Sequence, residues 1–137
     1  MVLLSLSIKM LPDGITTAGS QFNGLGGSGI PVAVIYGFIR TGLSEEIIFR
    51  GFLLKRFQAW LGFKAGNMIQ AFLFGLMHGI PFLFATHSIG SLILLTLLPG
   101  TFGWYQGWLN EKQSNGSIVP SWLLHGMMNF ITTCITL

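Results

Sequence analysis

Charged side chains are the scarcest class in this sequence. The chain has 7 Lys plus Arg and 4 Asp plus Glu among 137 residues, so 8% of it is charged, against about 25% in a typical soluble domain. With hydrophobic residues at 51%, too little polar surface remains to cover a water-soluble globule. The same composition excludes intrinsic disorder, which requires low hydrophobicity and high net charge.

Cysteine is nearly absent as well. The single Cys134 excludes an internal disulfide, a Cys-x-x-Cys redox pair and a zinc site built on thiolates. The net charge is +3, but the cations are scattered and form no basic patch that would bind nucleic acid. The basic excess instead suits a membrane protein, in which positively charged loops stay in the cytoplasm.

Long apolar stretches are what the chain has instead. We expect four of them, at about residues 30–54, 68–80, 89–109 and 118–137. Three approach the roughly 20 residues needed to cross about 30 Å of hydrocarbon. The second is short, because we expect Pro81 to end it, and Pro99 should kink the third. The sequence therefore predicts an all-α fold, a polytopic membrane bundle of about four transmembrane helices.

The N-terminal part of the chain has a different composition. We expect residues 1–29 to form a helix stub followed by a flexible loop rich in glycine and serine, and residues 30–137 to form the membrane domain. Positive charges flank the loops that follow the first and third spans, at Lys55, Arg56, Lys64 and Lys112. These loops should face the cytoplasm. We therefore expect an integral membrane protein, which in a bacterium would lie in the plasma membrane.

Two adjacent carboxylates and an arginine lie inside the first apolar stretch. Each such residue costs about 2.5–3.5 kcal/mol near the centre of a membrane helix, so each is a candidate for function. Glu46 and Arg50 are four residues apart and can pair on one helix face. Glu45 is rotated by about 100° and points elsewhere. A purely structural ion pair would explain Glu46 and Arg50 but would leave Glu45 without a role.

Imidazole and amide groups lie in two further apolar stretches. His78 ends the second stretch, and His125 and Asn129 share one face of the fourth. Taken singly, such residues often supply packing or hydrogen bonds between helices. Taken together, polar groups of this cost usually face the bundle interior and pair with one another. We therefore expect Glu45, His78, His125 and Asn129 to converge.

A convergent set of this kind suits the attack of water on an amide. A carboxylate and an imidazole can activate the water, while a second imidazole and an amide can stabilise the oxyanion. Alternatively, Glu45, His78 and His125 could bind zinc, with water as the fourth ligand. The spans hold no acid beyond Glu45 and Glu46, so no carboxylate remains to orient zinc-bound histidines. We therefore favour a site without a metal cofactor.

Three segments resemble the motifs of a known family. Residues 44–54 (SEEIIFRGFLL), 74–78 (FGLMH) and 125–129 (HGMMN) are similar, in this order, to the three motifs of the CPBP intramembrane proteases. This family comprises the CAAX prenyl endopeptidases and the bacteriocin-processing Abi proteins. The stretch from Gly103 to Pro120 resembles the family's link into its last motif. The resemblance covers about residues 40–132.

The resemblance implies a role for each candidate residue. Glu45 would activate the water with His78, and His125 and Asn129 would stabilise the oxyanion. Glu46 and Arg50 would organise the site. The family is described both as metalloproteases and as metal-free glutamate proteases.

The sequence thus predicts an intramembrane endopeptidase. Its partners would be the lipid bilayer and a membrane-associated or lipidated peptide. The rival hypotheses are a non-catalytic bacteriocin-immunity protein and a small proton-coupled carrier. A carrier needs one titrating carboxylate and does not require the remaining polar residues, so the whole set favours hydrolysis.

Overall fold

The computed structural model describes residues 20–137, which contain helices and turns but no strand. Two short 3₁₀ turns, η1 (Ser20–Phe22) and η2 (Gly26–Gly29), come first. A long helical segment follows, made of α2 (Ile30–Val34), η3 (Ile35–Leu43), α3 (Ser44–Glu46), η4 (Ile47–Leu54) and α4 (Lys55–Thr86). The chain then forms α5 (Ile89–Trp108), η5 (Leu109–Gln113) and α6 (Val119–Thr136). The predicted all-α class is confirmed for this part of the chain.

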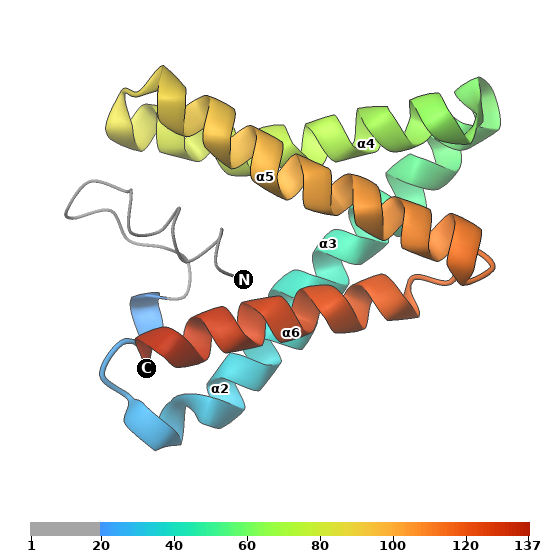
Figure 1. The fold of residues 1–137 in the computed structure, drawn as a ribbon. Coiled ribbons are helices and arrows are strands. Elements are labelled where there is room, and N and C mark those ends of the chain that lie inside the picture. Colours follow the sequence, from blue (N-terminus) through green and yellow to red (C-terminus); the bar gives the residue numbers. More distant parts are fainter. Residues whose placement is uncertain (1–19) are drawn as a thin grey trace.

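The long helical segment is broken once, at Gly62. Its φ of 78° and ψ of 165° are readily available only to glycine, which has no Cβ. The chain reverses there, and the rest of α4 runs back beside α5 (Figure 1). We call residues 30–61 the first arm and residues 63–86 the second arm. We expected a charged loop at this point, but a single glycine makes the turn.

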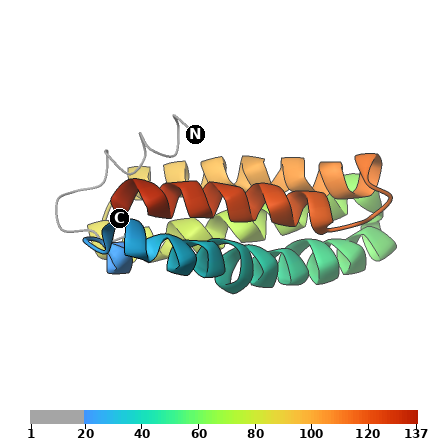
Figure 2. The same cartoon turned by 90° about the horizontal axis from the view of Figure 1, so that it is seen from below.

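The helices form two layers. Figure 2 shows α5 and α6 in one layer and the two arms in the other. The second arm packs along α5, and the first arm packs along α6 through η3. Glycines let the backbones approach closely, as is common between membrane helices. Gly75 faces the Thr96 carbonyl, and a Cβ at Gly37 would lie 2.7 Å from the backbone nitrogen of Phe130.

The second arm continues past Pro81. The expectation that this proline ends the helix is wrong, because α4 extends to Thr86. Proline removes one backbone donor, but neighbouring helices can support such a helix. Here Gly79 lies against Thr96 and Leu92 of α5.

One continuous stretch, Gly26–Thr86, is long and apolar enough to cross a membrane. Its 61 residues would span about 90 Å at 1.5 Å per residue, far more than the roughly 30 Å of hydrocarbon. The stretch therefore has to be considered as two arms that reverse at Gly62. Among residues 20–137, α5 and α6 do not reach the same length and hydropathy, so the predicted count of four spans is not confirmed.

The outer surface of the first arm and α4 is apolar. Ile39, Ile48, Phe52 and Phe72 are each more than half exposed, and only 28% of the most apolar window is buried. This is the reverse of a water-soluble protein, in which such side chains form the core. It is the surface that a membrane-embedded helix presents to lipid.

The two positively charged turns lie at one end of the molecule. Lys55 pairs with Glu111, and Gln58 donates a 2.9 Å hydrogen bond to the same carboxylate. The Lys112 ammonium lies 4.5 Å from the centre of the Phe63 ring. The turn at Gly62 and the α5–α6 turn therefore share one face, as the predicted topology requires (Figure 1).

The predicted N-terminal stub falls outside the described residues over positions 1–19. Residues 20–29 form short 3₁₀ turns that are tied to the C-terminus. The backbone nitrogens of Gly24 and Gly26 each lie 3.1 Å from the carbonyl oxygen of Leu137, to which they donate.

The close approach of α4 and α5 can be tested at Gly75. A Cβ there would overlap the Thr96 carbonyl oxygen, so Gly75→Ala should destabilise the fold by about 1–3 kcal/mol. Gly90→Ala is the matched control, because its Cβ would meet nothing closer than 3.6 Å. Thermal unfolding midpoints in detergent should fall for Gly75→Ala and not for Gly90→Ala. Equal midpoints would contradict the packing.

Candidate active site

A fully buried ion pair lies at the centre of the site. Arg50 Nη1 is 3.1 Å from Glu46 Oε1, and neither side chain is exposed. The pairing predicted from the spacing of these residues is confirmed. The guanidinium also lies 4.2 Å from the centre of the Phe74 ring, which stabilises the cation further. Gly103 of α5 leaves room for it, since a Cβ there would lie 2.8 Å from Arg50 Nη2.

The imidazole of His125 lies between the two adjacent carboxylates. Its Nδ1 is 2.9 Å from Glu46 Oε1, and its Nε2 is 3.6 Å from Glu45 Oε2. Because Glu46 is paired with Arg50 as a carboxylate, it accepts, and Nδ1 of His125 carries the proton. In the neutral ring, Nε2 then presents a lone pair to Glu45.

His78 is held in the same tautomer from the second arm. Its Nδ1 lies 2.8 Å from the backbone carbonyl oxygen of Phe74. A carbonyl can only accept, so Nδ1 donates and Nε2 is unprotonated in the neutral ring. That Nε2 is 4.0 Å from Glu45 Oε2. Two imidazole lone pairs therefore converge on one carboxylate oxygen.

Glu45 differs from Glu46 in having a buried oxygen that no group in residues 20–137 donates to. Its Oε2 is buried and makes no hydrogen bond to the described part of the chain. The Glu45 side chain is 22% exposed and that of His78 is 34% exposed, whereas that of His125 is only 7% exposed. The converging groups are thus accessible from the side of Glu45 and His78. A donor such as water, or a cation, would satisfy all three.

Asn129 makes its hydrogen bond away from these groups. Its Nδ2 donates to Thr41 Oγ1 over 2.8 Å, and that hydroxyl is 3.0 Å from the carbonyl oxygen of Tyr36. The structure therefore brings together Glu45, His78 and His125 and ties Asn129 to the first arm one turn along α6. The amide nitrogen of Asn129 keeps a second N–H.

Three buried polar residues that hold Glu46 or its partners were not among the predicted site residues. Ser121 Oγ donates to Glu46 Oε2 over 2.6 Å, Asn110 donates to Ser121, and Gln106 accepts from Arg50. All three are fully buried. The sequence feature that could have identified them is the one that identified His125 and Asn129: polar residues four positions apart in a largely apolar stretch.

The expectation that no carboxylate remains to orient the histidines is wrong for His125. Glu46 pairs with Arg50 and still accepts from His125, and the Phe74 backbone carbonyl accepts from His78. Two imidazoles oriented in this way and a carboxylate form a donor set whose chemistry suits zinc. Within residues 20–137, however, no three His, Cys, Asp or Glu side chains are gathered closely enough to hold a metal ion.

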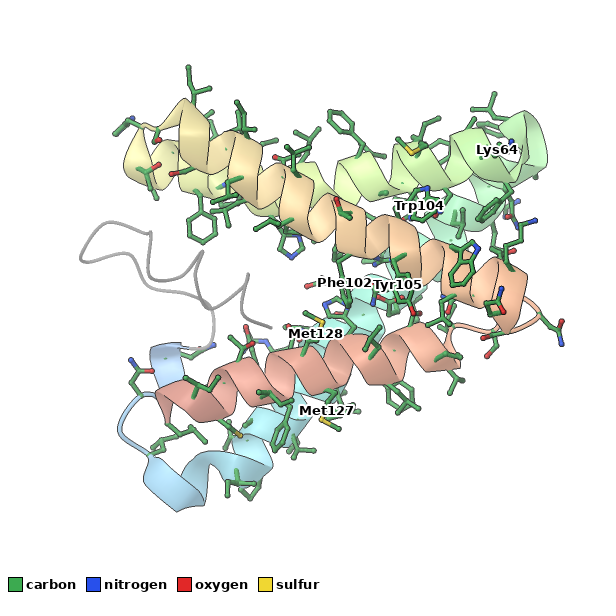
Figure 3. The ribbon with its side chains drawn as sticks, in the orientation of Figure 1. Lys64, Phe102, Trp104, Tyr105, Met127 and Met128 are labelled. Atoms are coloured by element: carbon green, nitrogen blue, oxygen red, sulfur yellow. The ribbon has the colours of Figure 1, made fainter. Side chains whose placement is uncertain are left out.

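Aromatic side chains surround the imidazole of His125. The ring centres of Phe74 and Phe102 lie 5.8 and 6.2 Å from that of His125. Figure 3 shows Phe102 and Tyr105 of α5 and Met128 of α6 on the sides of these helices that face each other, whereas Met127 points away. Such apolar surroundings strengthen the electrostatic interactions inside the site.

Comparison with known families gives one match. The model of the family described as type II CAAX prenyl endopeptidase Rce1-like matches residues 27–131. This range includes every candidate residue described above. No curated protein and no solved structure matches the chain.

The different surroundings of the two carboxylates predict different effects on stability. Glu46→Gln should destabilise the protein by about 3–5 kcal/mol, because it leaves Arg50 as an unpaired buried cation. Glu45→Gln should have little effect on folding, because this side chain is partly exposed and its ion-pair partners within residues 20–137 are the two histidines rather than an arginine or lysine. Folded yield and unfolding midpoints in detergent would measure both. Equal losses would show that the carboxylates do not differ in this way.

Proposed function

The chain belongs to the type II CAAX prenyl endopeptidase Rce1-like family, since that family's model matches residues 27–131, and on this premise we propose that it is an intramembrane endopeptidase. The resemblance to the CAAX prenyl endopeptidases drawn from the three motifs is thereby confirmed. The match concerns this branch of the resemblance and not the bacteriocin-processing one.

The observation that carries the proposal is the orphaned oxygen of Glu45. A carboxylate oxygen faces the Nε2 atoms of His125 and His78 at 3.6 and 4.0 Å, and no group in residues 20–137 donates to it. These separations suit one intervening water molecule, which would donate one hydrogen bond to Glu45 and the other to Nε2 of His78. The lone pairs of its oxygen would then be available for attack on a carbonyl carbon.

The proposed reaction needs one proton to move twice. Glu45 takes a proton from the water as its oxygen bonds to the scissile carbonyl carbon. The negative charge on the carbonyl oxygen is stabilised by the second N–H of Asn129 and by Nε2–H of His125, a ring that takes up this proton from solvent before the attack and keeps it throughout. Glu46 would hold the positive charge of His125 through Nδ1. The proton then passes to the leaving amine as the carbon–nitrogen bond breaks.

The proposed substrate is a lipid-anchored peptide. A C-terminal C-a-a-X sequence carries its prenyl group on the cysteine, which places the cleaved bond near the bilayer. The exposed apolar faces of the first arm and α4 suit the lipid bilayer as partner, and nucleic acid is not an expected ligand.

Cleavage of a farnesylated CAAX peptide in proteoliposomes tests this proposal. Glu45→Gln, His78→Ala and His125→Ala should abolish cleavage, and Asn129→Ala should lower its rate by about 10²–10³, the usual effect of losing one oxyanion donor. His87→Asn is the matched control. His87 is exposed and ends α4 with a φ of 51°, a conformation that asparagine tolerates.

The control should cleave at the wild-type rate. Cleavage by Glu45→Gln at the wild-type rate would show that the carboxylate does not activate the water. Loss of activity in His87→Asn would mean that the assay reports imidazole loss in general.

We propose that the water is held without zinc. If zinc were bound, Glu45, His78 and His125 would hold it, and it would make its bound water more acidic. Elemental analysis of active protein, purified without chelator or nickel resin, should find well under one zinc per chain, and chelation should leave cleavage unchanged. One zinc per chain, with activity lost on chelation and restored by zinc, would establish a metalloprotease instead.

A further inference from the structure

Three buried amide and hydroxyl groups form a second layer behind Glu46. Gln106 of α5, Asn110 of η5 and Ser121 of α6 are each 0% exposed. Buried polar groups are costly unless they are hydrogen-bonded, and the cost is highest where no water can replace a lost partner. We therefore expect each of these residues to be hydrogen-bonded, with a donor and an acceptor that can be assigned.

The bonds from Asn110 and Ser121 point towards Glu46. Asn110 Nδ2 donates to Ser121 Oγ over 2.7 Å, and Ser121 Oγ lies 2.6 Å from Glu46 Oε2. An amide nitrogen can only donate, so the bond from Asn110 uses a lone pair of the Ser121 hydroxyl and leaves the hydroxyl proton for another acceptor. The hydroxyl has one proton, and the carboxylate is a stronger acceptor than the Ile118 carbonyl at 3.0 Å.

Gln106 fixes the position of Arg50 relative to α6. Its Oε1 accepts from Arg50 Nη2 over 2.5 Å, and its Nε2 donates to the Ser121 carbonyl over 3.2 Å. One amide thus connects the guanidinium on the first arm to the backbone of α6. The cation and the hydroxyl that both bind Glu46 are held by the same side chain.

Both oxygens of Glu46 are consequently occupied. Oε1 accepts a hydrogen bond from His125 Nδ1 and forms the ion pair with Arg50, and Oε2 accepts a hydrogen bond from Ser121. A carboxylate held at one oxygen can rotate about its last bond, whereas donors on both oxygens fix its plane. With the carboxylate held in this plane, Oε1 accepts the hydrogen bond from Nδ1 of His125, and Nε2 of the same ring faces Glu45.

We propose that Ser121, Asn110 and Gln106 are positioning residues that hold Glu46 so that His125 keeps its proton on Nδ1. Their effect on cleavage rests on the proposed function, whereas their effect on the tautomer does not. A merely structural role would change stability and leave the tautomer unaltered.

The tautomer can be measured directly at one fixed pH. The chain has 3 histidines, so ¹⁵N-histidine labelling and solid-state NMR in proteoliposomes give few signals, which variants of His78 and His87 assign. The two nitrogens of a neutral ring differ according to which one carries the proton. We expect the signals of His125 in the wild type to be those of the Nδ1–H form.

Substitutions of the second layer give the decisive comparison. Ser121→Ala removes the donor to Oε2 and should give a mixture of tautomers at His125. Asn110→Leu should act in the same direction but less, because the hydroxyl remains. Ser121→Thr keeps the hydroxyl and should restore the wild-type signals.

Asn67→Leu is the matched control for loss of a buried amide. Asn67 is also 0% exposed and donates to the Trp104 carbonyl over 3.0 Å, away from Glu46. It should cost stability and leave the His125 signals unchanged. An Nδ1–H form that persists in both Ser121→Ala and Asn110→Leu, or an Nε2–H form in the wild type, would overturn the proposal.

Kinetics give a second reading. Ser121→Ala should lower kcat about 10–100-fold, as is usual for partners that orient a functional histidine, with KM unchanged. Ser121→Thr should recover most of the loss. Unaltered kcat in Ser121→Ala would contradict the positioning role. A wild type that cleaves no CAAX peptide would refute the proposed function, and the NMR comparison would still decide the positioning role.

Discussion

The carboxylate of Glu46 is the group on which the rest of the structure depends. A buried charge requires partners, and those of Glu46 are Arg50 on the first arm, which forms an ion pair with it, and Ser121 and His125 on α6, which donate hydrogen bonds, while Gln106 of α5 holds Arg50 in place. The bonds from Ser121, His125 and Gln106 join different helices and restrict where one can lie relative to another. Replacing such a set by apolar residues can leave stability unchanged or increase it, so geometry rather than stability explains its presence.

Adjacent positions on one helix turn have opposite roles. Glu46 is paired with Arg50 and accepts two hydrogen bonds, whereas Glu45 keeps an oxygen that has no donor in the described part of the chain. His125 lies between them and contacts one carboxylate with each ring nitrogen. Satisfying one acid fully therefore orients the ring that faces the other. The stretches on either side of α3 are π-helical, a geometry that is rare and is found frequently at functional sites.

The polar interior and the apolar exterior follow from the same constraint. Exposed isoleucines and phenylalanines cover the outer faces of the arms, while glycines such as Gly75 and Gly103 make room for backbone and for Arg50 inside. Lys55 and Glu111 are confined to one end of the molecule. In an apolar environment polar groups are favourable only where they meet one another, so the polar groups of three apolar stretches gather at one place.

The sequence by itself determined whatever depends on local spacing. Scarce charge and long apolar stretches gave the helical class, the four-residue spacing gave the Glu46–Arg50 pair, and isolated histidines in apolar segments identified His78 and His125. The tertiary structure decided what depends on how helices meet. The continuation past Pro81 and the bond from His125 to Glu46 could not be predicted, because each depends on contacts between residues distant in the chain. Gln106 and Ser121 acquire their roles only when α5 and α6 pack against the first arm, since a hydrogen bond requires atoms within about 3 Å and sequence spacing does not fix that distance across helices.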